Sequence, residues 1–98
     1  MAYNEGKPGK EVSDVPEEAI GRVEAYFSRV GVAAIQLSGA LHVGDTVHIR
    51  GHTTDLLQAV DSMEIDRQPI SEAGPGADVG IRVKERVRDG DRVYRIIP

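Results

Sequence analysis

Residues 41–51 read Leu-His-Val-Gly-Asp-Thr-Val-His-Ile-Arg-Gly, and this stretch decides the fold class. Gly44 and Asp45 predict a tight turn, because glycine tolerates positive φ and an aspartate side chain can hydrogen-bond the nearby backbone. After the turn, Val47 and Ile49 alternate with polar residues, which is the two-residue period of a half-buried strand. The stretch therefore predicts a turn that leads directly into a strand.

The same pattern recurs along the chain. Gly90 and Asp91 precede a second alternating run, and residues 76–81 form a looser third version. We expect the strands to cover residues 20–27, 30–37, 46–51, 56–66, 79–84 and 92–97, with a brief segment at Pro69 and Ile70. Many short strands between Gly/Asp turns favour a small closed antiparallel β-barrel of about six to seven strands, because closure removes exposed sheet edges. The predicted fold class is therefore all-β.

Four local features need an interpretation. A helix competes for residues 30–37, but the β-branched content and Gly31 favour a strand. The apolar parity changes within residues 56–66, and a β-bulge near Asp61 and Ser62 would restore it. Pro16 followed by two glutamates could start one helical turn. Asp89 and Gly90 predict a hairpin-type turn.

Size and composition predict one domain. The chain has 98 residues, 40% apolar and 29% charged, and no cysteine, which excludes disulfides and thiolate metal sites. We expect a flexible tail over residues 1–15 and a barrel domain over residues 16–98. No signal peptide or apolar run of membrane-spanning length is visible, so a cytoplasmic protein is expected. No cofactor is expected.

Charge is distributed unevenly along the chain. The net charge is −4, but residues 81–98 carry six basic side chains and three acidic ones. A general polyanion binder would be basic overall, so a nucleic-acid role would require a local patch.

Five motifs follow one another along the chain: Val43-Gly44-Asp45, Thr53-Thr54-Asp55, Val60-Asp61-Ser62-Met63-Glu64-Ile65, Pro69-Ile70 with Glu72-Ala73 and Gly76, and Asp78-Val79-Gly80-Ile81. Their order resembles the β-barrel second domain of translation elongation factors of the Tu type. The resemblance covers residues 20–98 and is closest to small free-standing translation elongation factor-like proteins. A similar domain closes the C-terminus of collagenase-like peptidases, which carry a step like Tyr26-Phe27-Ser28.

The resemblance implies a barrel that docks on RNA or on a translation or RNA-modification protein. No phosphate-binding loop of the form G-x-x-x-x-G-K-[ST] is present, so GTP binding and hydrolysis are not expected.

The candidate RNA- or partner-binding residues are Arg82, Lys84, Arg86 and Arg88. At strand spacing, alternate residues project from one face about 6.6 Å apart, so four cations in line could follow a phosphate backbone. The alternative is an ordinary solvated strand face. Phe27 is expected in the core, and the few aromatic residues are too sparse for a base-stacking platform.

Other polar residues give no catalytic or metal site. His48 and His52 on one strand would lie about 13 Å apart, so surface histidines are expected. The acidic residues Asp61, Glu64, Asp66 and Glu72 fit a solvated face better than a general acid/base pair. No Ser/His/Asp pattern is present.

Three hypotheses follow. The first is a non-catalytic binding module for RNA or a translation protein. The second is a protein-interaction subunit of an enzyme such as a collagenase-like peptidase, with no RNA contact. The third, a small enzyme, has no visible catalytic constellation to support it.

Overall fold

The computed structural model of the chain describes residues 16–98, and the predicted tail over residues 1–15 lies outside them. Ten strands and no helix are found in the described part. No helix there is long and apolar enough to cross a membrane. The strands are β1 (Glu17–Phe27), β2 (Val32–Leu37), β3 (Leu41–His42), β4 (Thr46–Arg50), β5 (Asp55–Ala59), β6 (Met63–Ile65), β7 (Gln68–Ile70), β8 (Glu72–Ala73), β9 (Asp78–Arg82) and β10 (Arg92–Ile96).

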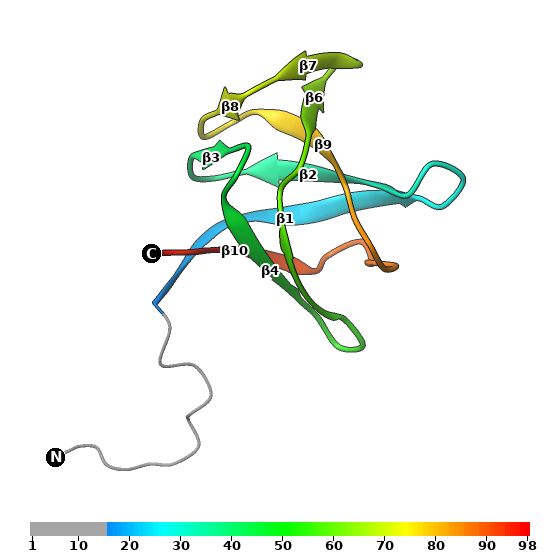
Figure 1. Cartoon of the computed structure of the whole chain (residues 1–98). Helices are drawn as coiled ribbons and strands as arrows, with labels where there is room; N and C mark the ends of the chain where they lie inside the picture. Colours follow the sequence, from blue (N-terminus) through cyan, green and yellow to red (C-terminus); the bar gives the residue numbers. More distant parts are fainter. Residues whose placement is uncertain (1–15) are drawn as a thin grey trace, which may run out of the picture.

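Eight strands form one antiparallel sheet in the order β5-β4-β10-β1-β2-β9-β6-β7, and β3 pairs with β8 separately. The long β1–β2 hairpin extends to one side of the molecule, and β6, β7 and β8 lie together at the top of the view (Figure 1). β10 inserts between β1 and β4, so the C-terminal strand joins the two parts of the sheet. The all-β prediction is confirmed.

The core is aliphatic and follows the predicted alternation. Val47 and Ile49 on β4 are fully buried, as are Val93 on β10 and Val23 on β1. Burying each such side chain contributes about 1.5–3 kcal/mol relative to leaving it exposed. The described core contains no aromatic residue that is fully buried. Phe27, predicted in the core, is instead 53% exposed at the end of β1, so that prediction is wrong.

The repeated Gly/Asp turn is confirmed in detail. The Asp45 carboxylate accepts a hydrogen bond from the His42 N–H at 2.9 Å, and the Asp91 carboxylate accepts one from the Arg88 N–H at 2.8 Å. In both turns the glycine has positive φ, 101° at Gly44 and 93° at Gly90. The two turns therefore have the same local structure, and each comes directly before a strand.

One buried side chain connects the β5 edge of the sheet to the end of β9. The Gln58 amide donates to the Arg82 carbonyl at 2.9 Å and accepts from the Lys84 N–H at 2.8 Å. β5 is the first strand of the sheet and β9 the sixth, so the sheet curves back on itself. Within residues 16–98, no ladder of hydrogen bonds joins β5 to β7, the two end strands.

The predicted strand over residues 56–66 is wrong. β5 ends at Ala59 and β6 begins at Met63, and the two pair with different neighbours. β5 lies against β4, whereas β6 lies between β9 and β7. The change in apolar parity thus marks a break between two strands. Residues 60–62 connect them and carry the chain from β5, at one end of the strand order, to β6, near the other end.

Three further boundaries differ from the sequence predictions. Residue 17 already belongs to β1, so no helical turn forms after Pro16. β2 starts at Val32, since the backbone turns through residues 28–31. The turn at Asp89 and Gly90 does not join a hairpin, because β10 pairs with β1 and β4 instead of β9.

Candidate functional site

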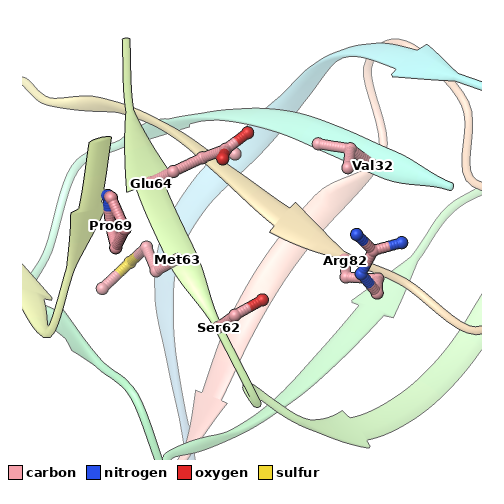
Figure 2. A pocket seen from close by; sticks show the side chains of 7 residues that line it. Val32, Ser62, Met63, Glu64, Pro69 and Arg82 are labelled. Carbon is pink, nitrogen blue, oxygen red and sulfur yellow. The ribbon is translucent and has the colours of Figure 1, made fainter. Parts of the chain in front are cut away.

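A groove of about 750 Å³ lies on the outer face of β2, β9 and β6. Its two ends are the turn between β1 and β2 and the turn between β6 and β7. A smaller hollow of about 150 Å³ continues it toward Met63 and Pro69 (Figure 2). The residues that line the larger groove are Phe27, Arg29, Val30, Val32, Ala34, Glu64, Asp66, Arg67, Asp78, Val79, Gly80 and Arg82.

The base of the groove is lined by residues with small side chains, which leave its depth unfilled. Gly80 on β9 is paired with Ala34 of β2 and with Glu64 of β6. A Cβ atom at position 80 would lie 3.3 Å from a Val32 methyl group and 3.4 Å from the Glu64 side chain. Glycine therefore allows Glu64 to reach from β6 toward β9, as Figure 2 shows.

The apolar end of the groove is the β1–β2 turn. Phe27 is 53% exposed and Val30 is 55% exposed, although both side chains are large and hydrophobic. The Arg82 guanidinium donates to the Val30 carbonyl at 2.9 Å, which fixes this turn against the end of β9. An exposed apolar pair beside a groove is the kind of surface that binds other molecules.

The opposite end of the groove has a strained turn. Asp66 and Arg67 connect β6 to β7 and have φ values of 52° and 66°. Two residues with positive φ define a type I′ turn, in which glycine would normally occupy the second position. A non-glycine residue held in this conformation occurs often at functional sites. The sequence pattern gave no signal of it.

The four predicted cations do not form one line. β9 ends at Arg82, and residues 83–88 are not a strand. Arg82 bonds to the β1–β2 turn, Arg86 lies 5.6 Å from the centre of the Tyr26 ring, and Arg88 donates to the Thr53 hydroxyl at 2.9 Å. Of these four predicted residues, only Arg82 lines the groove. The predicted strand spacing of the four side chains is therefore wrong beyond residue 82.

Two histidines lie between carboxylates. His48 on β4 contacts Glu17 at 2.9 Å through Nδ1 and Asp55 at 2.6 Å through Nε2. His42 on β3 lies 3.2 Å from Glu72 and 3.7 Å from the Asp45 carboxylate. Partial burial acts to lower the pKa of His48, but its hydrogen bonds to Glu17 and Asp55 outweigh burial, so the pKa is raised above 6.5. A protonated imidazole donates from both nitrogens, which suits two carboxylate partners.

These histidines do not make a metal centre. The two carboxylates of His48 bind opposite nitrogens of the ring, so one ion could not reach all three groups. No group of three or more metal-ligating side chains lies together in residues 16–98. Of the four acidic residues considered from sequence, Glu64 and Asp66 line the groove, whereas Glu72 pairs with His42.

The chain is similar to parts of peptidase-type proteins. It is 41% identical over 78 residues to a collagenase of Porphyromonas gingivalis, covering 78% of this chain and 22% of the collagenase. It is 42% identical over 76 residues to an uncharacterized protease of Methanocaldococcus jannaschii, covering 76% of this chain and 19% of the protease. The chain thus spans about a fifth of the length of the curated relatives it matches. No protein-family model matches.

Solved structures share the fold. The C-terminal domain of a Geobacillus thermoleovorans protein assigned to the U32 peptidases superposes with a TM-score of 0.76 at 20% identity, covering 82% of this chain and 93% of that domain. Its selenomethionine variant gives 0.74 at 22% identity, covering 78% and 96%. The predicted similarity to the C-terminal domain of collagenase-like peptidases is therefore confirmed, and the resemblance to elongation factors stays a prediction.

Proposed function

We propose that the chain is a non-catalytic docking domain that binds a peptidase-type catalytic domain through the groove between the β1–β2 and β6–β7 turns. The observation that carries this proposal is the similarity of most of the chain to only about a fifth of proteins named collagenase or protease. In those relatives, about four fifths of the protein lies outside the matched region, and this remainder is a partner that such a domain could bind. That makes protein docking a better supported function than RNA docking.

The groove has the properties of a docking surface. Its apolar end, Phe27 and Val30, supplies exposed hydrophobic area, and both charge signs occur along its walls. Protein interfaces combine an apolar centre with a polar rim in this way. A catalytic role has less support, because the groove contains no nucleophile with an adjacent base among the described residues.

We also infer that the curved sheet closes into a barrel and serves as a rigid platform for the groove. The bonds of Gln58 to Arg82 and Lys84 support this inference, since they join β5 to the end of β9. A platform of this kind would hold the two turns at a fixed separation.

Affinity purification of the tagged chain from its own cells, with and without nuclease, tests the proposal. We expect a peptidase-type protein to be recovered in both cases and to bind the purified chain directly. Recovery of tRNA-handling or ribosomal proteins that disappear after nuclease treatment would overturn the proposal in favour of RNA docking.

Matched variants locate the binding surface. The double variant Phe27→Ser with Val30→Ser should lose the peptidase-type protein. Leu57→Ser is the control, because Leu57 is 62% exposed on β5 and does not line the groove. Equal capture by both variants would show that the groove is not the docking surface. Purified chain should hydrolyse no peptide substrate by itself.

A further inference from the structure

Three arginines lie side by side on the outer face of the sheet, and none of the three lines the groove. Arg50 on β4 is paired with Arg92 on β10, and Arg92 is paired with Arg22 on β1. Directly paired residues on neighbouring strands project to the same face. All three residues are exposed, so we call them the arginine row. With adjacent strands about 4.8 Å apart, the row is about 10 Å long.

The row is only partly neutralised within the domain. Like charges placed directly opposite each other on a sheet are destabilising. Arg50 contacts Glu17 at 3.3 Å and covers the Tyr94 ring at 4.2 Å. In the part of the chain that the structure describes, neither Arg22 nor Arg92 forms an ion pair. Arg92 therefore has a cation on each side and no carboxylate of its own.

We propose that the arginine row binds a short acidic segment of the protein partner. The proposal rests on the proposed function, since it names the chemistry of a partner that is taken to be a protein. Guanidinium groups bind carboxylates through two parallel hydrogen bonds, so three in a row fit two or three neighbouring Asp or Glu side chains.

The surroundings of the row favour an acidic peptide over a nucleic acid. On β5 the residue paired with Arg50 is Asp55, and beyond Arg22 the cross-strand series continues through Gln36 to Asp78. A nucleic-acid strand longer than the row would place its next phosphates beside these carboxylates. The Tyr94 ring beside the row is already stacked against the Arg50 guanidinium, which covers one of the two faces on which a base could stack. The chain as a whole also carries a charge of −4.

The test is a titration of the full chain with a short polyglutamate peptide and, separately, with a single-stranded RNA of similar length. Low ionic strength is used, because screening weakens surface electrostatics at high salt. Nuclear magnetic resonance of the arginine Nε–H groups follows the binding. We expect the peptide to shift the signals of Arg22, Arg50 and Arg92.

Two double variants remove the same charge. Arg22→Gln with Arg92→Gln should weaken peptide binding by about tenfold or more, because each lost contact is a charge-assisted hydrogen bond. Lys84→Gln with Arg86→Gln should leave it unchanged. No binding of the peptide, or equal weakening in both variants, would overturn the inference. Tighter binding of RNA that only the first variant loses would assign the row to nucleic acid instead.

The two proposals can fail separately. A peptidase-type protein that is captured equally well by wild type and by the Arg22/Arg92 variant would overturn the role of the row and keep the proposed function. Peptide binding at the row without capture of such a protein would overturn the proposed function and keep the row as a site for acidic segments.

Discussion

The Gln58 side chain bonds to the backbone N–H of Lys84 at 2.8 Å across a gap that no strand pairing bridges. The same amide donates to the Arg82 carbonyl at 2.9 Å, and Gln58 is only 5% exposed. The Gln58 side chain thus joins β5 to the end of β9, where no backbone hydrogen bonds pair the two strands. Its contacts hold β5 against the end of β9 and the residues that follow it.

Gln58→Ala should destabilise the fold by about 2 kcal/mol, because it leaves the Lys84 N–H and the Arg82 C=O, which form part-buried hydrogen bonds, without their partner. Urea unfolding followed by circular dichroism measures the effect. Gln68→Ala is the control, since Gln68 is exposed on β7, and it should change stability by less than about 0.5 kcal/mol. Similar stabilities for the two variants would show that Gln58 does not hold the sheet together.

Gly51→Ala should be strongly destabilising. A Cβ atom at position 51 would lie 1.8 Å from the Asp91 carboxylate, which is buried and accepts the Arg88 N–H. Relieving that overlap by displacing Asp91 should cost about 1–3 kcal/mol. Gly74→Ala is the matched control, because open space surrounds position 74. Thermal unfolding compares the two variants.

A double-mutant cycle identifies the cause of that loss. In an Asp91→Ala background, the cost of Gly51→Ala should fall by at least about 1 kcal/mol, because the overlapping carboxylate is gone. An unchanged cost would place the strain elsewhere.

Much of the fold could be predicted from local pattern. Gly44 and Asp45 specify their turn through φ and a side-chain bond to the backbone, and both effects act within four residues. The alternation of Val47 and Ile49 fixes which face of β4 is buried. These features depend on neighbours in sequence, so sequence reasoning was able to find them.

Features that depend on pairing could not be predicted. A change of parity between residues 56 and 66 fits a bulge or a chain break equally well, and the partner strands decide between them. The arginine row unites residues 22, 50 and 92, which only the register of β4, β10 and β1 brings together. The exposure of Phe27 likewise depends on how far the β1–β2 hairpin extends past its neighbours.

The candidate site was found only in part. Arg82 was predicted as a binding residue and does line the groove. Lys84, Arg86 and Arg88 were grouped with Arg82 because alternate residues at strand spacing share a face, but the chain leaves the sheet after Arg82. Val83 and Val87 are buried in this segment, and because it is not a strand, the cations at positions 84, 86 and 88 do not share one strand face.

His48 should make stability depend on pH. Its pKa in the folded state is raised above 6.5, chiefly because its hydrogen bonds to Glu17 and Asp55 outweigh the opposing effect of burial. A raised folded-state pKa contributes stability that is fully present below the unfolded pKa and is lost as pH rises through the folded pKa. The stability advantage of wild type over His48→Gln should therefore shrink as pH rises above about 6.5.

Urea unfolding at a series of pH values between about 6 and about 9 measures this change. His52→Gln is the control, because His52 is exposed and forms no ion pair with another residue in the 16–98 range. A constant difference between wild type and His48→Gln across the series would refute the linkage to His48.

Arg67→Gly should stabilise the fold by about 0.5–1 kcal/mol. Arg67 has a φ of 66°, a left-handed conformation that costs a side chain about 1 kcal/mol and costs glycine little. The substitution would also create Asp-Gly, a favoured pair for the two-residue turn between β6 and β7. The urea midpoint measures the gain.

Arg29→Gly is the matched control, since Arg29 lies in the β1–β2 turn without positive φ, and it should lose stability slightly. A loss in Arg67→Gly would mean that the arginine side chain makes stabilising contacts that exceed the backbone strain. A gain in stability with weaker capture of the peptidase-type protein would instead show that the strain is retained for binding at the groove.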